Sequence, residues 1–198
     1  DAFDKNKFAV YVAKLKVAAI KKLSCMDFQS FFYDDICFFD FDIYGMVRDF
    51  LDDTTRLFWD SLYAKQVNFP GTAKNLFLPD WYFDSTDFAY SIPENYYLTR
   101  ERIESLQLNF YHASLGKILN KENTSNYAAI FLSNIYNYLS RDDKGNYYTF
   151  IKGVLAERLS IDGSISVYAP PYIRNPEIIE YDGTLNSYKK AYIYKKER

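Results

Sequence analysis

The run YAAIFLSN at residues 127–134 constrains the fold more than any other part of this chain, because apolar side chains follow one another in it without alternation. Such a run is typical of a strand that is buried on both faces of a parallel sheet. Parallel strands need a long crossover connection, usually a helix, and helical patterns lie on both sides of this run. The sequence therefore favours an α/β fold.

Strand and helix patterns alternate through the second half of the chain. The expected elements are helices at 99–106, 114–121 and 148–160, strands at 107–111, 127–134 and 164–169, and a terminal antiparallel pair formed by 177–181 and 189–196. This alternation predicts a doubly wound, mostly parallel Rossmann-like sheet that ends in an antiparallel strand pair.

The first third of the chain has helical patterns. A helix is predicted at 7–23, with Asn6 as its N-cap, because apolar residues recur on one face. The stretch SCMD at 24–27 has the form of a capping box and predicts a second, short helix. Helix is also expected over 43–65, with a restart at Thr54.

Residues 66–97 combine prolines with many aromatic side chains, Trp81 among them. Two interpretations remain open: a lid or binding loop, or an irregular segment that packs its aromatic rings on the core. The chain as a whole is expected to be one domain over 1–198, with a helical and aromatic-loop insertion over about 24–97.

Composition narrows the class of protein. With 198 residues, 48% of them hydrophobic, the chain is large enough to bury a core. Its net charge of −2 argues against broad binding to nucleic acid or anionic membranes. The two cysteines, Cys25 and Cys37, have no metal-ligand spacing and favour a reducing cytoplasm. No apolar run approaches the ~20 residues of a membrane span, so no integral membrane association is expected.

Ligands of doubly wound sheets bind at the carboxyl ends of the strands. Asp4 follows an expected strand and precedes a helix, where a carboxylate can accept hydrogen bonds from ribose hydroxyls; capping of the helix is the alternative. His112 follows the expected strand 107–111, where it would lie beside an adenine ring or serve a structural role. Ser133 and Asn134 end the apolar run and would face the reacting centre.

Eight aspartates lie between residues 34 and 60. They are interpretable as metal or acid–base pairs, or as helix caps and solvated faces. Since no glycine-rich calcium-loop pattern accompanies them, caps and solvated faces are the favoured interpretation.

Four segments of the sequence resemble the class I S-adenosylmethionine-dependent methyltransferase-like superfamily. More narrowly, they are similar to the family of the diacylglycerol 3-amino-3-carboxypropyltransferase of betaine-lipid synthesis and its uncharacterised relatives. The segments are FDKNKFAVYVAKLKVAAIKKLSCMDFQSFF (3–32), TTRLFWD (54–60), YYLTRERIESL (96–106) and AAIFLSNIYNYL (128–139).

The resemblance implies a cofactor site for S-adenosylmethionine. Asp4 would bind its ribose, Asn6 would be a further cofactor-binding residue, and His112 and Ala113 would flank its adenine. Its methionine end would be bordered by Ser133 and Asn134. The acceptor-side candidates are Tyr136, Tyr138 and Trp81.

One family feature is missing from the sequence. The first strand of the superfamily and the glycine-rich turn after it have no counterpart here, and the seven glycines include no cluster that substitutes for that turn. We expect that the chain begins partway into its fold; loss of the cofactor site is the alternative.

The function expected from the resemblance is transfer of a methyl or 3-amino-3-carboxypropyl group from S-adenosylmethionine to an unidentified small-molecule or lipid acceptor. Two alternatives remain open. A non-catalytic interaction module with a degenerate transferase-like fold predicts no cofactor binding. An NAD-dependent oxidoreductase would also use Asp4 for a ribose, but needs a glycine fingerprint.

Overall fold

The structure is a computed structural model. It describes residues 2–4, 6–33, 40–68, 92–113, 126–132, 158–169, 179–180 and 190–195. The chain divides into two compact units, Asp1–Leu115 and Gly116–Arg198, and each is described by itself. The expectation of a single domain over 1–198 stays a prediction.

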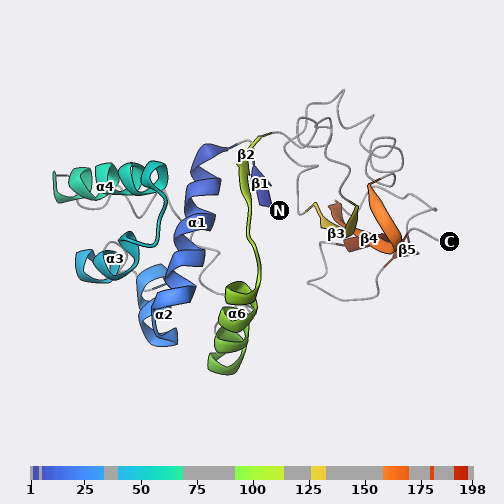
Figure 1. Cartoon of the computed structure of the whole chain (residues 1–198), viewed down its shortest axis with the longest axis horizontal. Coiled ribbons are helices and arrows are strands. Elements are labelled where there is room, and N and C mark those ends of the chain that lie inside the picture. Colours follow the sequence, from blue (N-terminus) through green and yellow to red (C-terminus); the bar gives the residue numbers. More distant parts are fainter. Residues whose placement is uncertain are drawn as a thin grey trace. The chain divides into compact units, whose positions relative to one another are not determined.

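Helix α1 (Lys7–Lys22) runs through the middle of the first unit (Figure 1). Its start is fixed by Asn6, whose side-chain oxygen accepts a hydrogen bond from the backbone N–H of Phe8 at 3.0 Å. Tyr11, Leu15 and Ala19 are buried along its length. The predicted helix and its N-cap are therefore confirmed.

Helix α2 (Cys25–Tyr33) follows after two residues. The Ser24 hydroxyl oxygen accepts the backbone N–H of Asp27 at 3.0 Å and donates to the Asp27 carboxylate at 2.7 Å. The Ser24 hydroxyl therefore caps α2, as the capping-box pattern predicts, and it satisfies a backbone donor that the helix leaves unpaired.

The helix expected over 43–65 is two helices, α3 (Phe41–Arg48) and α4 (Asp53–Asn68). The carboxylate of Asp40 caps α3, and the carboxylate of Asp52 caps α4 through the backbone N–H of Thr55 at 3.1 Å. The predicted restart near Thr54 is thus confirmed.

Helix α6 (Pro93–Ser105) begins inside the segment 66–97 that was expected to be irregular, so residues 93–97 of that segment are helical instead. Pro93 is the first residue of this helix, where its fixed φ and its missing N–H are well tolerated. The Tyr96 hydroxyl donates to the carbonyl oxygen of Leu23 at 3.0 Å, and the Arg100 guanidinium donates to the carbonyls of Ile20 and Leu23. Side chains of α6 therefore cap the buried end of α1.

The hydrophobic core of this unit lies where α1, α2, α3, α4 and α6 meet. Trp59 is 1% exposed, and its indole N–H donates to the carbonyl oxygen of Tyr11 at 3.3 Å. The other large side chains that are almost fully buried in this cluster are Tyr96, Phe28, Phe31, Leu23 and Val47.

Two short strands complete the unit. Strand β1 (Ala2–Asp4) pairs in parallel with β2 (Phe110–His112). The strand expected over 107–111 thus begins later and reaches one residue farther. Since the two strands are parallel, their carboxyl ends lie at one edge (Figure 1).

The second unit holds a four-stranded sheet. Its strands are β3 (Tyr127–Phe131), β4 (Leu159–Ala169), β5 (Ile179–Glu180) and β6 (Lys190–Lys195), in the order β3-β4-β6-β5. β3 and β4 are parallel, whereas β6 is antiparallel to both β4 and β5. The predicted terminal antiparallel pair is confirmed.

Two expectations about this unit were wrong. Leu159 and Ser160 were expected to end a helix, but they begin β4, where Leu159 pairs with Tyr127. The expected burial of 127–134 on both faces also fails for β3, because Ile130 is buried whereas Phe131 is 67% exposed.

Gly163 lies inside β4 rather than at a helix end. The register with β3 shifts there, and a Cβ on Gly163 would approach the Ser160 carbonyl oxygen to 2.8 Å. Only glycine accommodates so close an approach of the backbone.

The described elements make a mixed α/β fold. The helix expected at 114–121 and most of the one at 148–160 lie outside the described residues. Within the part of the chain that the structure describes, no helix combines the length and the apolar character needed to cross a membrane.

Candidate functional site

Asp4 and His112 lie opposite one another at the carboxyl ends of β1 and β2. The parallel register pairs Ala2 with Phe110 and Asp4 with His112, so both polar residues end their strands at the same edge. The backbone N–H of Ala113 donates to the carbonyl oxygen of Asp4 at 3.0 Å, which holds the two strand ends together.

The Asp4 side chain also shapes the turn into α1. Its Oδ1 accepts the backbone N–H of Asn6 at 2.7 Å, and the Asn6 side chain in turn caps α1. Among the described residues, no hydrogen bond is formed by Asp4 Oδ2. Because a carboxylate has about four lone-pair sites, this group retains capacity for a ligand beside its role in the turn.

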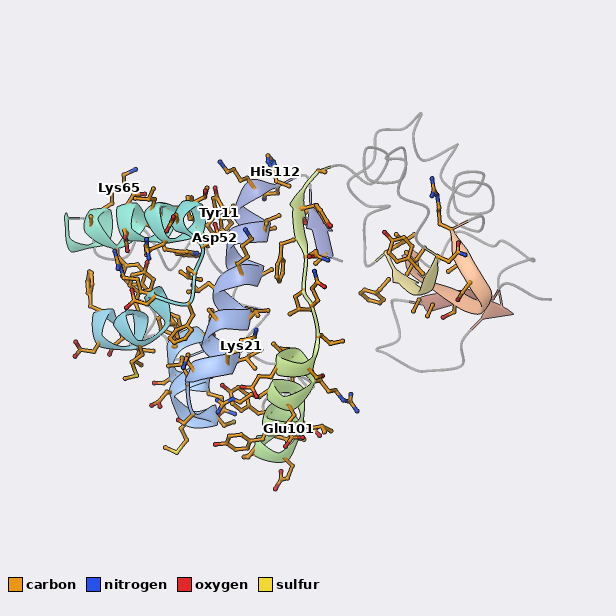
Figure 2. All side chains as sticks on the ribbon, in the orientation of Figure 1. Tyr11, Lys21, Asp52, Lys65, Glu101 and His112 are labelled. Atoms are coloured by element: carbon orange, nitrogen blue, oxygen red, sulfur yellow. The ribbon has the colours of Figure 1, made fainter. Side chains whose placement is uncertain are left out.

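His112 is exposed and lies near the start of α1 (Figure 2). Asp4 and Asn6 are also exposed. The structure therefore brings together the four predicted site residues of the first unit: Asp4, Asn6, His112 and Ala113.

The remaining predicted site residues lie outside the described residues. They are Ser133, Asn134, Tyr136, Tyr138 and Trp81. Their roles stay predictions.

The aspartates of α3 and α4 have structural partners. Asp60 accepts two hydrogen bonds from the Arg48 guanidinium, at 2.8 and 2.7 Å, and one from the Tyr44 hydroxyl at 2.8 Å. These hydrogen bonds, led by those from Arg48, hold the pKa of Asp60 below its usual value. Asp40 and Asp52 cap helices, as predicted for this group. In the described ranges, no three His, Cys, Asp or Glu side chains gather to hold a metal ion.

A pocket of about 390 Å³ elsewhere in the first unit was not predicted from the sequence. It is lined by one face of α1 from Lys14 to Lys21, by residues 50–52, and by residues 108–111. The Lys14 ammonium group forms an ion pair with Asp52 at 2.9 Å. No local pattern joins these three segments, because they are distant in sequence.

Comparisons of the chain with protein-family models, with curated proteins and with solved structures found no match. The geometry is therefore the evidence for function: a mixed α/β chain with an acidic residue and a histidine at the carboxyl ends of two adjacent parallel strands.

Proposed function

We propose that this protein is a transferase that uses S-adenosylmethionine, with Asp4 binding the cofactor ribose. The observation that carries the proposal is the pairing of Asp4 with His112 at the carboxyl ends of β1 and β2. In doubly wound sheets, this edge holds the ligand, and an acidic residue there accepts hydrogen bonds from the ribose.

The hydrogen-bonding capacity of the edge fits an adenosine group. A ribose diol needs acceptors, and Asp4 supplies a carboxylate whose Oδ1 is already oriented by Asn6. An adenine ring needs a flat partner and a backbone polar group beside it. In the proposal, His112 stacks on the ring, and the segment from His112 to Ala113 borders it.

The strand pairing supports a Rossmann-like, doubly wound fold. Such sheets have the strand order 3-2-1-4-5-6. What supports the proposal is one parallel pair in each described sheet, β1 with β2 in the two-stranded sheet and β3 with β4 in the four-stranded sheet. The proposal assigns Ser133 and Asn134, which follow β3, to the methionine end of the cofactor.

The transfer step requires positioning rather than a strong nucleophile on the protein. The cofactor, when bound, would supply a methyl or 3-amino-3-carboxypropyl group on its sulfonium sulfur. A lone pair of the acceptor would take this group, and the electrons of the broken carbon–sulfur bond would stay on sulfur. Holding donor and acceptor in line supplies much of the rate gain. Tyr136, Tyr138 and Trp81 are proposed to border a small-molecule or lipid acceptor. A cytoplasmic location is proposed as well, because the two cysteines favour a reducing compartment.

Calorimetric titration tests the cofactor. S-adenosylmethionine and S-adenosylhomocysteine are expected to bind the native protein, and Asp4→Ala is expected to weaken both by about tenfold or more, since hydrogen bonds to a charged group are lost. Asp42→Ala is the matched control, because Asp42 is an exposed carboxylate on α3.

The alternatives predict different titrations. Binding of NAD without S-adenosylmethionine would replace the transferase with an oxidoreductase. Absence of binding for all three ligands would contradict an adenosine site at this edge and would favour a non-catalytic interaction module.

A further inference from the structure

We propose that the pocket between α1 and the segment 108–111 is a binding site for a small amphipathic anion, of which a medium-chain carboxylate is the simplest example. This inference is independent of the proposed transferase function. It rests on the volume of the pocket, on the apolar side chains that line it and on the lysines at its rim.

The pocket has the size of a small-molecule site and a lining that is partly apolar. Its volume of about 390 Å³ lies within the range of roughly 300–1,000 Å³ in which ligand pockets fall. Val17 and Ala18 of α1, Leu51, and Leu108 with Phe110 contribute apolar surface. Such surface favours a hydrocarbon or aromatic body.

The charges at the pocket favour an anion. Lys14 and Lys21 both line it, spaced by seven residues and therefore on one face of α1. Asp52, the acidic residue of the lining, is already engaged by Lys14 and by Thr55. Lys21 is exposed and forms no ion pair within the described ranges. It is the cation left for the head group of a ligand.

Beside Lys21, the ammonium group of Lys22 is a second positive charge close to the pocket. Lys22 lies over the ring of Phe50, with its Nζ 3.9 Å from the ring centroid, and Phe50 lines the pocket. This contact holds a further ammonium group close to the rim without requiring an acidic partner.

The pocket is separate from the edge that carries Asp4 and His112. Lys21 and His112 lie toward opposite ends of α1 (Figure 2). The pocket lining includes neither Asp4, Asn6 nor His112. A ligand in the pocket is therefore expected to leave nucleotide binding at the strand edge unchanged.

Decanoate is the probe, and decanol and decyltrimethylammonium are its neutral and cationic counterparts. Calorimetry on the whole protein is expected to show saturable binding of decanoate, with weaker binding of the other two. Amide NMR shifts during the titration are expected at Lys21 and Leu108. Equal binding of all three compounds, no binding of decanoate, or shifts confined to other residues would overturn the proposal.

Two variants and one control test the site itself. Lys21→Gln is expected to weaken decanoate binding about threefold, the size of one solvent-exposed ion pair. Leu108→Glu places a negative charge in the apolar lining and is expected to weaken binding at least as much; Leu108 is 36% exposed. Lys65→Gln, an exposed lysine near the end of α4 and far from Lys21 (Figure 2), is expected to leave binding unchanged.

Circular dichroism establishes that each variant is folded, and either folded variant suffices for the test. Unchanged affinity in a folded Lys21→Gln or Leu108→Glu protein would overturn the site. Inorganic phosphate alone is expected not to bind, because it lacks the apolar body that the lining favours. Phosphate binding as tight as that of decanoate would contradict the proposed ligand class.

Discussion

The Nζ of Lys14 lies 2.9 Å from Oδ2 of Asp52, and this ion pair joins α1 to the start of α4. Asp52 also accepts hydrogen bonds from the backbone N–H and the hydroxyl of Thr55, at 3.1 and 2.7 Å. One carboxylate therefore caps a helix and pairs with a second helix. Partial burial raises its pKa, but the hydrogen bonds from Lys14 and Thr55 outweigh this effect and lower the pKa from 3.8 to about 2.

The lowered pKa of Asp52 predicts a loss of stability in acid. A carboxyl group with a lower pKa in the folded state stabilises the protein fully above its unfolded pKa and loses this contribution as pH falls toward its folded pKa. The window is therefore about pH 4 down to about pH 2. Urea unfolding across this window is expected to show that Asp52→Asn has a smaller pH dependence than the parent protein.

The cost of Asp52→Asn above the window is expected to be about 1 kcal/mol, because the side chain is 48% exposed and water screens the pair. Asp42→Asn is the control, and its pH dependence should match that of the parent. An Asp52→Asn protein with the full acid dependence would contradict this role.

Tyr96→Phe tests the cap at the end of α1. The variant removes the hydroxyl that donates to the carbonyl oxygens of Leu23 and Ile20, at 3.0 and 3.4 Å, while it keeps the buried ring. We expect a loss of about 1 kcal/mol in the free energy of unfolding. Tyr97→Phe on the same helix is the control, because Tyr97 is 45% exposed. Equal effects of the two variants would argue against a specific cap.

Trp59→Ala tests the core of the first unit. Trp59 is 1% exposed and its removal leaves a large cavity, so a loss of about 3–5 kcal/mol is expected in denaturant unfolding. Leu57→Ala, two residues earlier on α4, is expected to change stability by no more than about 0.5 kcal/mol, because Leu57 is 68% exposed. A comparable loss for Leu57→Ala would mean that another surface covers it.

Ser24→Ala tests the capping box of α2. The hydroxyl accepts the backbone N–H of Asp27, and its loss is expected to destabilise the protein by about 1 kcal/mol. Ser61→Ala within α4 is expected to have the opposite sign or no effect, since alanine is the better helix former. Thermal unfolding, followed by the far-ultraviolet circular dichroism of the helices, distinguishes the two variants. An unchanged thermal stability of the Ser24→Ala variant would contradict the capping role of the Ser24 hydroxyl.

Local signals in the sequence predicted much of the first unit. Asn6 and the Ser24–Asp27 box act on backbone groups within three residues, so their geometry follows from the sequence alone. The role of Pro93 was harder to predict, because proline occurs both in irregular segments and at the first position of helices. The burial of Tyr96 at 0% exposure, which decides between these roles, depends on α1 and is not a local property.

The second unit was less predictable for a related reason. Leu159 and Ser160 fit the end of an amphipathic helix, but pairing with β3 places them in a strand. Strand pairing overrides local propensity when partners distant in sequence are available. For the candidate site, the position of Asp4 beside His112 was predictable from strand ends, whereas the pocket near Lys21 joins three distant segments and was not.

The cap that α6 places on α1 has a consequence for the order of folding. Leu23 and Tyr96 are separated by 73 residues, and the partners of the last carbonyls of α1 are therefore synthesised long after the helix itself. Until α6 arrives, those carbonyls are hydrated and the core at this end of α1 lacks the side chains that α6 contributes. We expect the helices of this unit to acquire stability together, in a late step that closes a long stretch of chain, rather than one by one as they leave the ribosome.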